Sequence, residues 1–142
     1  MPRKKEVPLK TTEISELDYE GWQPEDYFAL LHPAAFARRF LNRELYTFQK
    51  IVLENAMKYK YLLVLCARQM GKTEAMAIYA LWYAISHPNR KVLIFAPKYE
   101  QAVKNLFGRI HDFIKSHPKL FSLVLVDGVT GKPKIGVDFV RF

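Results

Sequence analysis

The chain has 142 residues, the length of one domain and enough to bury a hydrophobic core. Its 22 Lys and Arg outnumber 14 Asp and Glu, and the net charge of +8 favours polyanions as partners, the alternative being a generally basic soluble surface. One cysteine excludes an internal disulfide framework and indicates a reducing compartment. No apolar run reaches the ~20 residues that span a bilayer, and the four histidines show no zinc spacing.

The first part of the chain predicts an arm followed by short helices. Residues 1–23 are polar and basic, so we expect a flexible arm ahead of a domain over residues 24–142. A first helix is expected over residues 24–31, and a second from Pro33 to about Leu41, because a proline disfavours helix at the residue before it and suits a first turn. Thr47 is a candidate N-cap for a third helix.

Strand-like and helix-like segments alternate in the middle of the chain. Residues 61–66 and 91–96 are short apolar runs typical of buried parallel strands. Residues 72–86 are apolar on nearly every side, which predicts a helix covered on several faces, and residues 102–116 predict a long amphipathic helix. This order predicts an α/β fold, a partial three-layer P-loop NTPase-type parallel sheet with a helical N-terminal extension.

The end of the chain changes character. Residues 121–126 are apolar, two turn signals follow at residues 127–128 and 130–131, and Val137 and Phe139 suggest another strand. This pattern predicts a C-terminal β-hairpin. Because the chain stops within an apparent strand, we expect a domain truncated at its C-terminus.

The segment between the first predicted strand and the 72–86 helix carries the chemistry. A standard phosphate-binding loop reads G-x-x-x-x-G-K-[ST] between a strand and a helix, and Gly71, Lys72 and Thr73 fit its end. Backbone N–H groups and the helix dipole favour phosphate there. Lys72 is expected to meet the β- and γ-phosphates of ATP, and the Thr73 hydroxyl to hold Mg²⁺. The alternative is a turn that merely contains a basic residue.

The loop departs from the standard pattern at its first position. Cys66 stands where glycine is usual, and cysteine does not adopt positive φ cheaply, so the start of the loop must have a different shape. No histidine or other base nearby in sequence would make Cys66 a nucleophile. We interpret it as a residue at the end of a buried strand.

With these residues the chain resembles the large subunit of viral terminases, the ATPase of DNA-packaging motors. The resemblance covers roughly residues 30–117 and rests also on residues 33–41 and 45–49 upstream and on residues 92–97 downstream. Its most specific part is the altered phosphate loop with an Arg-Gln pair before G-K-T, which comprises Cys66, Ala67, Arg68, Gln69, Met70, Gly71, Lys72 and Thr73.

The resemblance implies roles for individual residues. Gln49 would read adenine through its carboxamide, the alternative being an ordinary helix-surface glutamine. Tyr46 or Phe48 would pack on the adenine ring or serve as a core aromatic. Arg68 would stabilise charge near the γ-phosphate, the alternative being a solvent-facing loop arginine. With Lys72 it forms the expected catalytic pair.

A second acidic site is hard to find in the sequence. Hydrolysis requires an acidic residue after an apolar strand to hold Mg²⁺ and a carboxylate that orients water. Asp127 follows an apolar run, but Gly128 stands where the glutamate is expected, and a turn aspartate is the favoured interpretation. The acidic pair and a nuclease domain would lie beyond this chain, which is then expected to bind ATP but to hydrolyse it poorly alone.

The implied function is the ATP-binding part of a motor that moves double-stranded DNA into a viral capsid, with ATP and Mg²⁺ as cofactors. The resemblance implies double-stranded DNA, portal and small terminase subunits, and further copies of the chain as partners, no membrane, and the cytoplasm of the host cell for a virus-encoded or provirus-derived protein. A superfamily 2 helicase-like DNA translocase is the main alternative. A small kinase and a binding module that only retains the loop are the others.

Overall fold

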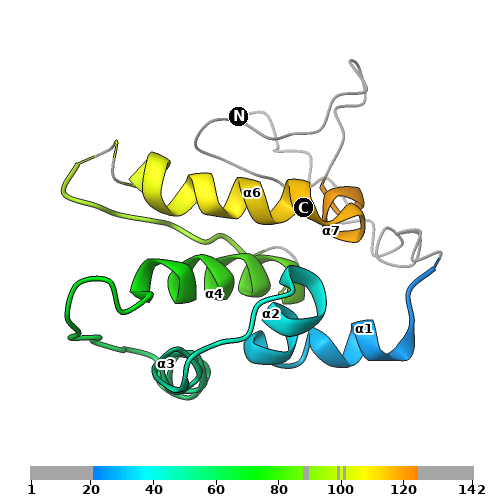
Figure 1. The fold of residues 1–142 in the computed structure, drawn as a ribbon, viewed down its shortest axis with the longest axis horizontal. Coiled ribbons are helices and arrows are strands. Elements are labelled where there is room, and N and C mark those ends of the chain that lie inside the picture. Colours follow the sequence, from blue (N-terminus) through cyan, green and yellow to red (C-terminus); the bar gives the residue numbers. More distant parts are fainter. Residues whose placement is uncertain (1–20, 88–89, 99, 101, 125–142) are drawn as a thin grey trace, which may run out of the picture.

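The computed structural model describes residues 21–87, 90–98, 100 and 102–124. Residues 1–20 of the arm predicted over residues 1–23, most of the predicted hairpin and Asp127 lie outside these residues. Figure 1 shows an arrangement of helices, and the described residues contain no β-strand. The predicted parallel sheet, and with it the α/β fold class, is therefore wrong for this part of the chain.

Three helices form the first layer. They are α1 (Pro24–Ala29), α2 (Pro33–Leu41) and α3 (Thr47–Lys58). The bounds of α2 match the prediction, because Pro33 occupies its first turn and Asn42 ends it in the left-handed conformation with φ +49°. Thr47 is the first residue of α3 and not its N-cap, which is Tyr46.

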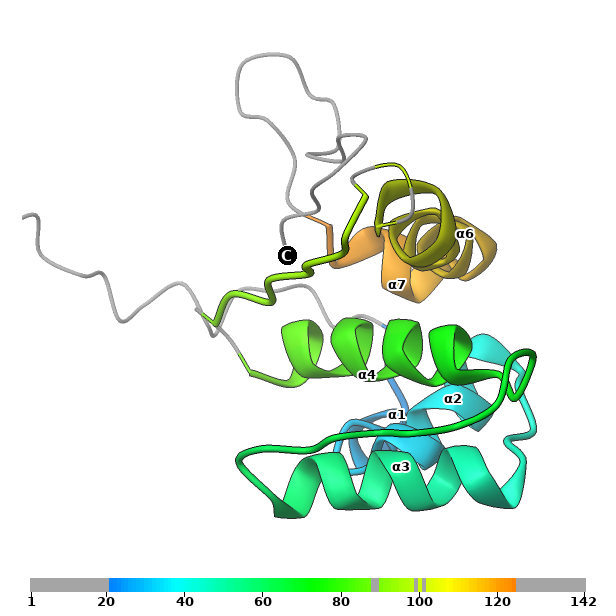
Figure 2. The ribbon, with the colours of Figure 1, turned by 90° about the vertical axis from the view of Figure 1, so that its left-hand side faces the viewer.

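Helix α4 (Lys72–Ser86) is the centre of the molecule and matches the predicted helix residue for residue. Figures 1 and 2 show α1, α2 and α3 on one side of it and α6 and α7 on the other. Its contacts with α2, α3, η1 and α6 explain why its sequence is apolar almost all round. None of the helices in the described part of the chain is long and apolar enough to cross a membrane.

The second layer begins with an irregular turn of helix. The predicted helix over residues 102–116 divides into a π-helix, η1 (Ala102–Phe107), and α6 (Gly108–Ser116). A short helix, α7 (Pro118–Ser122), follows directly, so Phe121 is helical and the expectation that a strand begins at this residue is wrong. Phe113, Ile114 and Leu120 are buried where this layer meets α4 and the first layer.

The two predicted strands are extended segments that do not pair with each other. Residues 61–66 pass on the α3 side of α4, whereas residues 91–96 pass on its α6 side (Figure 2). A parallel ladder needs strands about 4.8 Å apart, and α4 lies between these two segments. Most of their apolar side chains are exposed, above all Leu65 at 84% and Phe95 at 88%, while Val64 and Ile94 are half-buried.

A buried carboxylate ties the two layers together. Asp26 of α1 accepts hydrogen bonds from the Gln23 N–H at 2.9 Å and from Arg39 Nε of α2 at 2.6 Å, and it also accepts one from Lys119 Nζ of α7. Burial raises the pKa of Asp26, but the hydrogen bonds from Lys119, Gln23 and Arg39 outweigh it and hold this pKa well below its usual range. Asp26 is therefore ionised and fully paired at neutral pH.

Candidate functional site

The phosphate loop, residues 66–73, leaves the extended segment 61–66 and includes the first two residues of α4, Lys72 and Thr73. Two of its residues have positive φ, Gln69 at +65° and Gly71 at +79°, and Cys66 is not among the positive-φ residues. The two left-handed residues thus lie late in the loop, and Cys66 at its first position is not one of them. A non-glycine residue at positive φ, such as Gln69, is uncommon and typical of strained functional loops.

The loop leaves the start of α4 available to an anion. Gly71 is the N-cap of α4, and no side chain of the described residues caps this end. Left-handed residues that alternate with right-handed ones turn successive N–H groups to the same side, which forms a concave anion-binding site. The N-terminal end of a 15-residue helix adds its dipole to those groups.

The predicted phosphate-contacting side chains lie around this end of α4. Arg68 and Lys72 are exposed, Thr73 is half-buried, and Cys66 is a half-buried free thiol. Glu74, in the first turn of α4, lies 3.7 Å from Arg43 Nε, so its carboxylate is partly neutralised by a neighbouring cation. The loop therefore presents two positive side chains, Arg68 and Lys72, beside a helix N-terminus, and neither forms an ion pair within the part of the chain that the structure describes.

Gln49, on helix α3, is a predicted site residue that hydrogen-bonds to the loop. Its Nε2 donates to the Gly71 carbonyl at 3.1 Å, and its Oε1 accepts from the Tyr46 N–H at 3.0 Å. Gln49 is only 1% exposed, which excludes the helix-surface interpretation. The two aromatic candidates for an adenine-packing role differ, because Tyr46 is exposed and Phe48 is half-buried.

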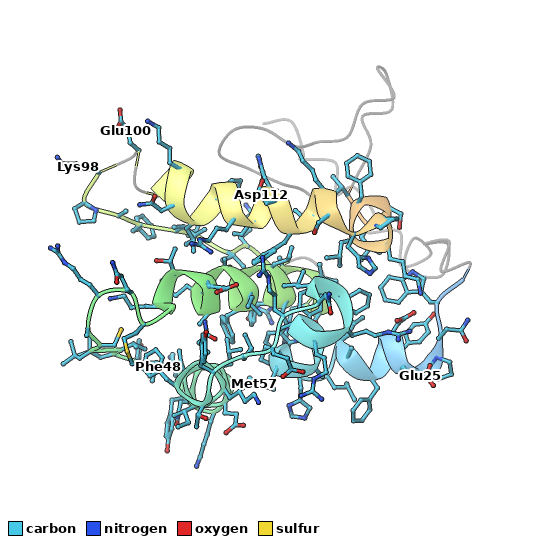
Figure 3. The ribbon with its side chains drawn as sticks, viewed as in Figure 1. Glu25, Phe48, Met57, Lys98, Glu100 and Asp112 are labelled. Atoms are coloured by element: carbon cyan, nitrogen blue, oxygen red, sulfur yellow. The ribbon has the colours of Figure 1, made fainter. Side chains whose placement is uncertain are left out.

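A polar cleft of about 560 Å³ opens beside the loop, between the first turn of α4 and the second layer. Thr73 is the residue that the cleft shares with the loop, and Lys104, Arg109 and Lys115 supply three positive charges against the single carboxylate of Asp112. The cleft is lined by Thr73, Lys104, Asn105, Gly108, Arg109, His111, Asp112 and Lys115. Figure 3 shows Asp112 on α6, with Lys98 and Glu100 at the end of the molecule where the loop lies.

Lys104 and Arg109 lie on an exposed face of η1 and α6. The structure places that face against the cleft and adds Lys115 and Asp112, which the sequence analysis had missed. The signal was present, since residues 104, 108, 111, 112 and 115 recur at helical spacing on the polar side of the predicted helix. The sequence could not show that Thr73 lines the same cleft.

The described residues do not form a metal cage made only by protein side chains. Within the described ranges, no group of three or more His, Cys, Asp and Glu residues gathers to hold a metal. Mg²⁺ usually keeps several waters and binds one or two protein oxygens together with substrate phosphates. The Thr73 hydroxyl at the start of α4 suits that arrangement.

Comparison of the chain with known protein families, with curated proteins and with solved structures found no match.

Proposed function

We propose that this chain is the ATP-binding part of a DNA-packaging motor of the terminase large-subunit type, in which ATP hydrolysis drives double-stranded DNA into a viral capsid. The observation that carries the proposal is the loop of residues 66–73, with left-handed Gln69 and Gly71 ahead of the uncapped N-terminus of α4. Such a loop favours a phosphate chain in its concavity.

Different residues of the loop would contact different parts of the nucleotide. The backbone N–H groups at the start of α4 would bind phosphate oxygens, and the exposed Lys72 would place its ammonium against the β- and γ-phosphates. Thr73 would contribute its hydroxyl to Mg²⁺, which supplies charge neutralisation on the phosphates when bound. Arg68 would stabilise the charge that develops during phosphoryl transfer.

Two features support a DNA partner. The chain has a net charge of +8, and three of its cations line the cleft that begins at Thr73. Contacts between cations and the DNA backbone weaken steeply as salt rises, because counterions are released on binding. The Arg68–Gln69 pair favours the packaging motor over a superfamily 2 DNA translocase, whose loop usually keeps more small residues.

The nucleotide part of the proposal is tested by thermal unfolding with and without Mg-ATP. A ligand at 100 times its dissociation constant stabilises by roughly 2.7 kcal/mol, which shifts the midpoint of a domain of this size by about 8 °C. We expect Lys72→Ala to abolish the shift and Lys58→Ala, at an exposed lysine in the last turn of α3, to preserve it. Absence of a shift in the folded native chain, or an equal shift in Lys72→Ala, would contradict the proposal.

The DNA part is tested by fluorescence anisotropy with a labelled duplex over a range of salt concentrations. We expect the logarithm of the association constant to fall linearly with the logarithm of the salt concentration. Replacing Lys104 and Lys115 with alanine should lower the slope by about one to two, since each phosphate contact contributes about 0.9. An unchanged slope in this double variant would show that the cleft is not part of the DNA-binding surface.

A further inference from the structure

We infer that Gln49 is a positioning residue that sets the shape of the phosphate loop through the Gly71 carbonyl, and that it does not read the base of the nucleotide. The effect on ligand affinity rests on the proposed function. The effect on the loop itself does not, because the contact between Gln49 and Gly71 joins two residues of the chain itself.

The first argument is that both ends of the carboxamide are already occupied. Reading adenine bidentately takes the carbonyl oxygen and the amide nitrogen of a glutamine at the same time. In Gln49 the oxygen accepts the Tyr46 N–H and the nitrogen donates to Gly71. With 1% of the residue exposed, its remaining N–H and lone pair face the protein and not a base.

The second argument concerns what the Gly71 carbonyl controls. This oxygen accepts the Ala75 N–H at 3.1 Å, which opens the hydrogen-bond ladder of α4, as well as Gln49 Nε2. A trans peptide is rigid and planar, so fixing the direction of the Gly71 carbonyl also fixes the Lys72 N–H, which points the opposite way. That N–H belongs to the set at the helix start that would bind phosphate. Gln49 therefore orients a phosphate donor without contacting the ligand.

The third argument is the space that this contact requires. A Cβ on residue 71 would lie 2.6 Å from Gln49 Nε2, closer than real Cβ contacts allow. Glycine at this position thus permits both the left-handed backbone and the close approach of the carboxamide. The two residues form one unit that joins the first turn of α3 to the start of α4.

Two variants test the two hydrogen bonds that the Gln49 carboxamide makes. Gln49→Glu keeps an oxygen for the Tyr46 N–H but loses the donor to Gly71, and Gln49→Met keeps the volume of the side chain but loses both bonds. Asn55→Ala is the matched control, because this amide lies on the same helix and donates only within it, to the Ile51 carbonyl at 2.7 Å. Urea unfolding of each variant establishes that it is folded.

The first readout is the affinity for ATP, GTP and inorganic triphosphate, each with Mg²⁺. A positioning role predicts that both Gln49 variants weaken the binding of all three ligands to a similar extent, by about three- to tenfold, because both lose the hydrogen bond to the Gly71 carbonyl. Asn55→Ala should change none of them. Weakening of ATP alone, with GTP and triphosphate unaffected, would show that Gln49 reads adenine and would overturn the inference.

The second readout needs no ligand and separates this inference from the proposed function. Amide hydrogen exchange in the free chain should become at least severalfold faster at Ala75, whose N–H donates to the Gly71 carbonyl, in both Gln49 variants and stay unchanged in Asn55→Ala. If the native chain binds none of the three ligands, the proposed function fails while faster exchange still supports the positioning role. Unchanged exchange at Ala75 in a folded Gln49→Met variant would overturn the inference.

Discussion

Replacing Gly71 with alanine tests how closely the backbone of the loop and the Gln49 side chain depend on each other. The substitution adds a Cβ to a residue with φ +79° and places it 2.6 Å from Gln49 Nε2. Two costs follow, one from the backbone conformation and one from the displaced carboxamide. They can be measured separately because the chain contains a second glycine with almost the same φ.

The magnitudes come from the geometry. A residue with a Cβ in the left-handed region costs about 1–2 kcal/mol. Displacing Gln49 removes its hydrogen bond to the Gly71 carbonyl, for about 1 kcal/mol more. We therefore expect Gly71→Ala to lower the free energy of unfolding by about 2–3 kcal/mol, a large share of the 5–15 kcal/mol typical of a domain. Gly21→Ala, at φ +85° with no atom within 4 Å of the added Cβ, should show only the first cost.

Urea denaturation followed by circular dichroism measures these differences in a double-mutant cycle with Gln49→Ala. Once the carboxamide is gone, the added Cβ meets no obstacle, so Gly71→Ala should then cost about 1 kcal/mol less than in the native background. Equal costs in the two backgrounds would refute the coupling between Gly71 and Gln49. If Gly21→Ala and Gly71→Ala lowered the free energy of unfolding equally, backbone strain alone would account for the effect of Gly71→Ala.

Two further predictions concern the contacts that hold the helices together. Because the pKa of Asp26 is lowered in the folded state, its contribution to stability is present above its unfolded pKa and is lost as pH falls, so urea midpoints of the native chain should drop below about pH 4. Asp26→Asn should lower the free energy of unfolding at pH 7 by about 2 kcal/mol and make the fall of the urea midpoint below pH 4 less steep. A fall as steep as in the native chain would contradict the attribution of this pH dependence to Asp26. Tyr79→Phe removes the hydroxyl that donates to the Ala56 carbonyl of α3 at 3.0 Å and should cost about 1 kcal/mol in the same assay. Tyr83→Phe, whose ring stacks on His87 at 4.2 Å, is the control and should cost less.

The helices that were predicted well begin and end at local signals. Pro33 starts α2 and a left-handed Asn42 ends it, while Gly71 and His87 bracket α4. Each of these signals acts on its own backbone and needs no distant partner. The π-helix η1 was missed because one extra residue per turn hardly alters the apolar pattern of residues 102–116.

The strands failed for the opposite reason. An apolar run such as residues 61–66 indicates a segment suited to a sheet, but pairing depends on a neighbour that the run itself does not specify. In the described part of the chain, residues 91–96 are the other such run, and α4 lies between the two. The apolar pattern of the two runs therefore predicted their extended backbone correctly but did not predict whether they pair in a sheet.

The site was predicted in part. The loop residues 66–73 follow one another in sequence, so their position before α4 could be predicted directly. The contact of Gln49 with Gly71 spans 22 residues, and the family resemblance had suggested a base-reading role instead. The cleft was missed because it needs two helices, one that carries Thr73 and one that carries Lys104 and Lys115.

The two exposed extended segments also bear on how the chain behaves in concentrated solution. Residues 61–66 and 92–96 contain neither charge nor proline, and uncovered backbone with such side chains is the usual starting point of edge-to-edge aggregation. Cations flank both runs, with Lys58, Lys60 and Arg68 around the first and Arg90, Lys91 and Lys98 around the second. Flanking charges of one sign act as gatekeepers, because two copies that approach at these runs repel each other. The basic character of the chain thus keeps its apolar edges apart, and high salt, which screens that repulsion, should bring copies together.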